Sequence, residues 1–224
     1  MASEHGTSVE RVHRALRENI LSGSYPPGSR LILARLAREH EVSFIPVREA
    51  LQRLEAERLV RIERNRGATV TEISIPDMKD IYETRLLLEQ SAIRSAVASI
   101  SPAQLRAAET ALRRMRARFR KGEAAAAYAA HEDFHFGLYE AAGSPWTVHL
   151  VRQLWSSAER YVRLAASVRP DPDRFVDEHA EILAAVQRGD GDAAANRLAD
   201  NLRTTEDLLA QTYDSGSSDQ EAAG

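Results

Sequence analysis

The chain contains no cysteine among its 224 residues. Disulfide bonds and thiolate metal sites are therefore excluded. No apolar run approaches the ~20 residues needed to cross a bilayer, and the first residues lack the charged and apolar segments of a signal peptide. We therefore expect a cytoplasmic protein with no membrane partner.

Lysine is absent from residues 1–70, which carry 12 Arg against 9 Glu and so have a net charge of +3. The whole chain has a net charge of −3, so residues 71–224 carry −6. A basic N-terminal part suits a domain that meets phosphates, although the excess is small. The hydrophobic content of 43% is enough for two modest domains or one large one.

The segment from Val42 to Val60 has the spacing of a helix with one buried and one exposed face. Its apolar positions recur at intervals of three and four residues: Val47, Leu51 and Leu54. The opposite face carries Ile45, Arg48, Gln52 and Arg53. Such a helix has a face to present to a partner.

The flanking residues predict a winged helix-turn-helix. Ser43 is placed to cap this helix, and Pro46 falls in its first turn, where the missing N–H needs no intrahelical partner. A shorter helix over Leu33–His40 precedes it, and a join of only two residues predicts a helix-turn-helix. After Leu59 the pattern changes to two short strands around Gly67, a hairpin or wing. An earlier helix is expected from Ser8 onward.

These motifs resemble the DNA-binding half of GntR-type bacterial repressors. The similarity rests on VSFIPVREALQRLEAERLV, RNRGATV and the turn YPPGSRL, and it spans about residues 8–73. It implies a double-stranded DNA operator as partner. The outward guanidinium of Arg48 can bind a guanine edge or a phosphate. Arg66, expected at the hairpin tip, suits a minor groove. The residues expected to contact DNA are Ser43, Phe44, Ile45, Arg48, Gln52, Arg66 and Gly67.

Two positions depart from the family pattern. Many relatives have Arg where this chain has Phe44, and Gly where it has Arg58. Phe44 cannot make a bidentate base contact, so a thymine methyl group is the contact left open to it. The pattern gives no account of Arg58.

A second domain is expected over residues 77–213, after a linker over 71–76. Helical spacing continues throughout it, and the short joins predict an antiparallel bundle. Residues 214–224 have the composition of a disordered tail. The predicted fold class is therefore mainly α, with an N-terminal winged helix-turn-helix carrying a small β-hairpin and a C-terminal all-helical bundle.

Several polar side chains fall on the inward stripes of these helices. Arg85 lies on an apolar stripe, where it needs an anionic partner or a wet cavity. His131 and His135 lie one turn apart on one stripe, and His179 faces inward from a later helix. Three imidazoles make a metal tripod with an open position for an effector oxygen. They equally suit neutral core histidines bonded to one another and to Asn201.

These residues resemble the FCD ligand-binding domain of the FadR subgroup of GntR regulators. The resemblance implies one divalent ion, zinc or nickel, per subunit beside a small carboxylate effector. The family's four ligand positions, which follow the order Asp, His, His, His, fall here on His131, His135, His179 and Asn201. Asn201 is a poor ligand for zinc or nickel, which leaves the metal open. The expected effector contacts are Arg85, His135, His179, Asn201, Arg160 and Arg163.

The sequence thus predicts a one-component bacterial transcription regulator rather than an enzyme. It would bind a palindromic operator as a homodimer and release it on binding the effector. One alternative is a zinc-dependent hydrolase, because His131-Glu132-x-x-His135 matches the HExxH pattern with Glu132 as general base. The other is a DNA-binding module whose helical domain only dimerises, which leaves the inward Arg85 and histidines unexplained.

Overall fold

The computed structural model describes residues 2–63, 67–169 and 171–221. The chain folds as two compact units, Met1–Ser74 and Ile75–Gly224. The predicted fold class, mainly α with a small antiparallel sheet, is confirmed. Among the described residues, none of the helices combines the length and apolar character required to span a bilayer.

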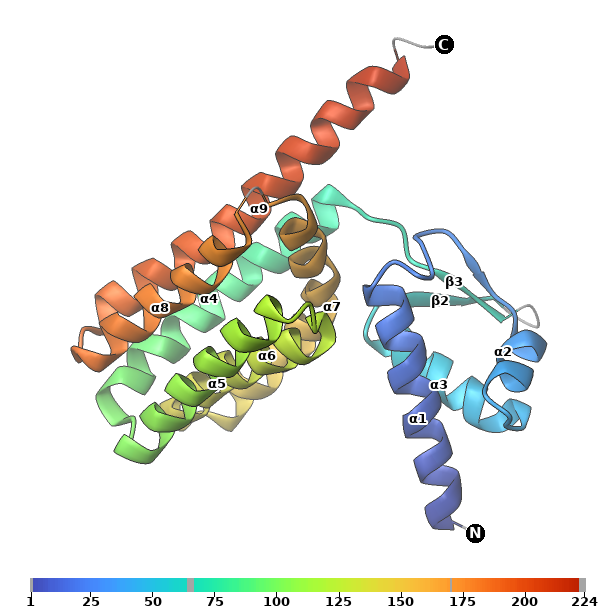
Figure 1. Cartoon of the computed structure of the whole chain (residues 1–224), viewed down its shortest axis with the longest axis horizontal. Helices are drawn as coiled ribbons and strands as arrows, with labels where there is room; N and C mark the ends of the chain where they lie inside the picture. Colours follow the sequence, from blue (N-terminus) through green and yellow to red (C-terminus); the bar gives the residue numbers. More distant parts are fainter. Residues whose placement is uncertain (1, 64–66, 170, 222–224) are drawn as a thin grey trace. The chain divides into compact units, whose positions relative to one another are not determined.

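Unit 1 is a winged helix-turn-helix (Figure 1). Its elements are α1 (Ala2–Leu21), β1 (Arg30–Leu31), α2 (Leu33–Glu39), α3 (Phe44–Ala56), β2 (Val60–Glu63) and β3 (Gly67–Val70). The strands form one antiparallel sheet in the order β1-β3-β2, with Ile62 paired to Ala68 across the hairpin. The sequence did not predict β1, because two residues are too few to show the alternation of a strand.

The inner face of α3 is buried in the core of unit 1. Val47, Leu51 and Leu54 are at most 2% exposed. They share one apolar cluster with Val12 and Leu16 of α1. Burying whole aliphatic side chains stabilises by about 1.5–3 kcal/mol each. The outer face of α3 is therefore held in a fixed orientation.

Both helices of the helix-turn-helix end at a residue with a left-handed backbone. Arg58 follows α3 with a φ of 59°, and Glu41 follows α2 with a φ of 54°. The turn at Arg58 is closed by hydrogen bonds of 2.9 Å from the Leu59 N–H to the Leu54 carbonyl and from the Arg58 N–H to the Glu55 carbonyl. This is a Schellman motif, in which glycine is the favoured residue. The glycine expected from the family pattern at Arg58 thus has a backbone cause.

Arg58→Gly is expected to raise the free energy of unfolding by about 0.5–1 kcal/mol. Glycine relieves the left-handed strain, although its greater freedom in the unfolded chain offsets part of the gain. Urea denaturation measures the difference. Arg58→Ala keeps the strain and serves as the matched control, so equal stabilities of the glycine and alanine variants would contradict this account.

Glu57, the C-cap residue of α3, ties this helix to α1. Its carboxylate accepts hydrogen bonds from His13 Nε2 at 2.6 Å and from Arg17 Nε at 2.8 Å. Burial acts to raise the pKa of Glu57, but the hydrogen bond from His13 and the charge of Arg17 outweigh it and hold the pKa below its ordinary value. The ionised carboxylate is therefore favoured in the folded state.

The stabilisation from Glu57 should depend on pH. A lowered folded-state pKa contributes stability above the ordinary value of 4.5, and this contribution is lost as the pH falls through the folded-state pKa. Melting curves of the wild type and Glu57→Gln should differ most near neutral pH and converge as the pH falls below 4.5 and then through the folded-state pKa. A constant difference across that range would rule out the ionic role.

Unit 2 is a bundle of helices that run back and forth (Figure 1). Its elements are α4 (Ile75–Ser99), α5 (Pro102–Arg120), α6 (Ala124–Tyr139), the 3-10 helix η1 (Glu140–Ala142), α7 (Pro145–Val168), α8 (Pro172–Gln187) and α9 (Gly191–Glu221). α4 packs against α7 and α9, α5 against α6, and α8 against α9. Two helices, α6 and α8, carry the histidines singled out by the sequence.

The helix ends in unit 2 follow from local chemistry. Ser101 and Gln104 form a capping box at the start of α5, and Ser144 accepts a backbone N–H at the start of α7. Gly143 and Gly189 follow η1 and α8 with φ values of 69° and 71°. These left-handed stops produce the short joins that place successive helices antiparallel.

Three helix boundaries differ from the prediction. α1 begins at Ala2 rather than Ser8, and α4 begins at Ile75, because Pro76 in the first turn needs no N–H partner. The tail predicted to be disordered from residue 214 is helical as far as Glu221, and residues 222–224 lie outside the described part. No proline follows Pro172 in the sequence, so no proline ring interrupts α9.

Candidate nucleic-acid interface and metal centre

The outer face of α3 carries most of the residues predicted to contact DNA. Phe44 and Ile45 are 53% and 60% exposed, and Ser43, Arg48 and Gln52 are also exposed. Ser43 occupies the N-cap position, but its side chain makes no capping hydrogen bond. Within residues 2–63, 67–169 and 171–221, Arg48 has no ion-pair partner. Its guanidinium is therefore available to an outside partner.

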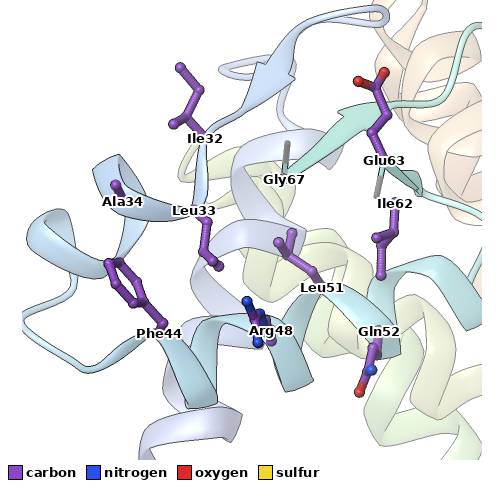
Figure 2. Close-up of a pocket in the computed structure, with 10 residues that line it drawn as sticks. All are labelled: Ile32, Leu33, Ala34, Phe44, Arg48, Leu51, Gln52, Ile62, Glu63 and Gly67. Carbon is purple, nitrogen blue, oxygen red and sulfur yellow. The ribbon is translucent and has the colours of Figure 1, made fainter. Parts of the chain in front are cut away.

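A hollow of about 530 Å³ lies beside this face. Figure 2 shows its walls, formed by the start of α2, the outer side of α3 and the hairpin. Arg48 and Gln52 line it with polar groups, whereas Ile32 and Phe44 line it with apolar ones. In a helix-turn-helix the second helix enters the major groove. The hollow is thus a concave surface with mixed chemistry at the position where a duplex is expected.

Gly67 at the hairpin is required by packing. Its φ is 100°, and a Cβ atom there would lie 2.2 Å from the carbonyl oxygen of Leu31. Only glycine allows β3 to approach β1 so closely. The adjacent predicted contact, Arg66, lies outside the described residues, so its contact with DNA stays a prediction.

Three histidines meet in the interior of unit 2. His131 and His135 come from α6 and His179 from α8, and all three are at most 5% exposed. One nitrogen atom of each lies within 4.8 Å of the others. Burial lowers the pKa of His131 and His135 well below the ordinary value and that of His179 to about 4. The rings are therefore neutral at pH 7 and offer lone pairs.

Hydrogen bonds fix the protonated nitrogen in two of these rings. His179 Nδ1 lies 2.6 Å from the Phe175 carbonyl oxygen, which can only accept, so Nδ1 donates. The Tyr139 hydroxyl donates to Glu89 at 2.5 Å and therefore accepts from His135 Nδ1 at 2.9 Å. Nε2 is left unprotonated in both rings, and that of His179 is buried without a hydrogen-bond partner in the described part. Metal-ligating histidines are oriented in this way.

Arg85 is buried in the same interior with Glu89 as its partner. Arg85 Nε lies 2.6 Å from Glu89 Oε1, and the two side chains are 2% and 0% exposed. Burial acts to lower the pKa of Arg85, but Glu89 outweighs it and raises the pKa, so the guanidinium keeps its charge. The Trp155 ring centroid lies 5.0 Å from both the Arg85 guanidinium and the His135 ring. Arg85 Nη1 has no hydrogen-bond partner among the described residues, which leaves a donor for an anionic ligand.

The other predicted effector contacts have internal partners. Asn201 donates Nδ2 to Glu178 Oε2 at 2.9 Å, and Glu178 adjoins His179 in the sequence. Arg160 and Arg163 each donate to a neighbouring side chain of α7 at 2.7 Å. These groups are largely buried. An effector that reached them would have to share or displace these bonds.

The HExxH order of residues does not form a hydrolase site. His131 and His135 point inward, whereas the Glu132 side chain is 38% exposed and pairs with Arg152 of α7 at 3.2 Å. A zinc protease needs this glutamate beside the metal-bound water as general base. The carboxylate is directed away from the histidines, so the hydrolase alternative is not supported.

Sequence reasoning missed Glu89, Tyr139 and Trp155. Glu89 follows Arg85 by four residues and Tyr139 follows His135 by four, a spacing at which side chains of one helix meet. That spacing was a usable signal for both. Trp155 belongs to α7, and only the tertiary packing of α7 against α4 brings it to Arg85.

Two family models match the chain in the expected order. Residues 8–70 match the family described as "Bacterial regulatory proteins, gntR family", and residues 80–204 match the FCD domain. The first match lies in unit 1 and the second in unit 2.

Similar proteins extend along nearly the whole chain. The "Uncharacterized HTH-type transcriptional regulator BphR" of Paraburkholderia xenovorans (strain LB400) is 30% identical over 214 residues, which cover 91% of this chain and 85% of BphR. The "HTH-type transcriptional repressor RspR" of Escherichia coli (strain K12) is 24% identical over 90% of this chain and 89% of its own. The crystal structure of a putative transcriptional regulator GntR from Rhodococcus sp. RHA1 aligns with a TM-score of 0.75 at 26% identity, covering 91% of this chain and 98% of that one.

Proposed function

Since the chain belongs to the GntR family of bacterial regulatory proteins and carries an FCD domain, we propose that it is a metal-assisted sensor of small carboxylates that represses transcription. Regulation of transcription through DNA is the function of this family, and the match covers both units. Our proposal adds four points to this family function: the metal, the class of effector, repression and membership of the FadR subgroup. The proposed place of action is the cytoplasm.

For the DNA half, α3 of each subunit enters a major groove of a palindromic operator bound by a homodimer. The exposed Arg48, which has no ion-pair partner among the described residues, supports this role. One winged unit spans too few base pairs for useful specificity, so two related copies are needed. The name of RspR, a repressor, supports repression as the mode of action.

The metal half depends on one observation, the convergence of three neutral imidazoles in a buried site. His131, His135 and His179 would hold a divalent ion, zinc or nickel, which supplies positive charge and an open position for an effector oxygen. The donor atoms lie within 4.8 Å of one another, whereas zinc–nitrogen bonds of ~2.1 Å place them ~3.4 Å apart. The distances between the donor atoms would therefore shorten by up to about 1.4 Å. Asn201, engaged by Glu178, leaves the fourth position to the effector.

The charge balance of this interior favours joint binding of ion and carboxylate. The charges of Arg85 and Glu89 cancel, and the three histidines are neutral. A carboxylate that entered with Arg85 Nη1 as its donor would bring an uncompensated negative charge, which is costly in a buried site. A divalent ion supplies the missing positive charge. The ion and the effector should therefore bind cooperatively.

Calorimetric titration of small mono- and dicarboxylates tests this coupling on the chelator-treated full chain, with and without zinc. We expect about 5- to 150-fold tighter carboxylate binding with zinc, and zinc binding strengthened by the same factor, because coupling is reciprocal. The neutral amide of the same acid is the matched control and should show no such dependence. Carboxylate affinity that is unchanged by zinc would contradict the coupling.

A further inference from the structure

We infer that α3 recognises thymine methyl groups through Phe44 and Ile45, so that the operator carries A·T base pairs where these side chains face it. The inference rests on the proposed DNA binding and adds which bases are recognised. The resemblance to GntR regulators leaves this open, because it implies Arg at the position of Phe44.

Exposed apolar side chains are concentrated at this face of unit 1. Phe44 and Ile45, in the first turn of α3, are 53% and 60% exposed. In the described part of unit 1, the only other large apolar side chain so exposed is Ile32, which lines the hollow together with Phe44. Apolar surface gathered at one place indicates contact with a partner.

The position of these side chains indicates base edges as the partner. Residues at the start of the second helix of a helix-turn-helix contact bases in the major groove. The apolar group that base pairs present there is the C5-methyl group of thymine. Opposite any other base edge, Phe44 or Ile45 would remove water from donors and acceptors without replacing their hydrogen bonds. Thymine is therefore the base that suits both side chains.

Arg48, whose guanidinium can bind a base edge, lies on the same helix as the apolar pair Phe44 and Ile45. It follows Phe44 by four residues, and Figure 2 shows Phe44, Arg48 and Gln52 in succession along α3. A fork that binds guanine O6 and N7 would then adjoin the thymines. An exposed arginine with no ion-pair partner in the described part also favours a polyanion over an apolar protein surface at this face.

The test begins with selection of an operator from random duplex DNA by the full-length protein. Each thymine is then replaced singly by deoxyuridine, which removes the methyl group and keeps the base pairing. We expect about fourfold weaker binding at each thymine that is contacted, the effect of burying one methyl group. Phe44→Ala and Ile45→Ala should each abolish the deoxyuridine effect at one thymine per half-site. Melting curves check that both variants stay folded, as their exposure leads us to expect.

Val168→Ala is the control, because Val168 is an exposed apolar side chain like Phe44 but lies at the end of α7 in unit 2. It should keep the full deoxyuridine effect. The inference is overturned if the selected half-sites lack thymine, or if both α3 variants retain the wild-type sensitivity to deoxyuridine. Failure to enrich any sequence would instead overturn the proposed DNA recognition, and this inference with it.

Discussion

Arg48→Ala is expected to weaken operator binding by roughly 30- to 20,000-fold at fixed salt. A bidentate arginine–guanine contact contributes about 1–3 kcal/mol, and a homodimer loses two of them, or about 2–6 kcal/mol. Thermal stability should hardly change, because Arg48 is exposed and has no ion-pair partner among the described residues. Fluorescence anisotropy with labelled operator measures the affinity.

Two variants separate recognition from charge. Arg48→Lys keeps the charge but loses the planar fork, so its affinity should fall between those of wild type and Arg48→Ala. Arg106→Ala removes the same charge from the exposed surface of α5 and should leave operator affinity nearly unchanged. If Arg48→Ala binds the operator as tightly as wild type, α3 does not contribute this residue to the interface.

His135→Ala is expected to abolish stoichiometric metal binding. The wild type should carry about one divalent ion per chain, and loss of one of three imidazole ligands should weaken binding by more than about 100-fold. Tyr139→Phe removes the hydroxyl that accepts from His135 Nδ1, and it should weaken binding by about 10- to 100-fold. Elemental analysis and titration with zinc after chelator treatment measure both effects.

The matched control for the metal site is His149→Ala, which removes an exposed imidazole of α7. This variant should keep the ion content of the wild type. A chelator should lower its melting temperature by as much as it lowers that of the wild type. A wild type that is isolated without metal and takes up no zinc would show instead that His131, His135 and His179 are hydrogen-bonded core residues.

Much of the architecture could be predicted from helical periodicity. The spacing of Val47, Leu51 and Leu54 identified the buried face of α3 and, by exclusion, the outward face of Arg48. The same rule turned His131, His135 and His179 inward, because a residue on an apolar stripe shares the burial of its neighbours. The structure buries all of these inward residues to within 5% exposure.

Features that depend on tertiary contact or on backbone conformation could not be predicted. The ring of Trp155 lies 5.0 Å from both Arg85 and His135, and the packing of α7 on α4 brings it to Arg85. The left-handed φ of Arg58 runs against the residue type, and only the glycine that the family pattern has at this position pointed to it. The ion pair of Glu132 with Arg152 joins α6 to α7 and likewise depends on tertiary packing. Each of these changes how the candidate site is interpreted.

Site-directed cleavage of the operator shows whether the outer face of α3 meets the bases. The chain has no cysteine, so Gln52→Cys provides a single attachment point for an iron-chelate reagent on this face. We expect cuts at two symmetric positions, one in each half-site, and none from Ser95→Cys on the exposed surface of α4. An uncut operator with the α3 reagent, or equal cutting from both positions, would contradict this expectation.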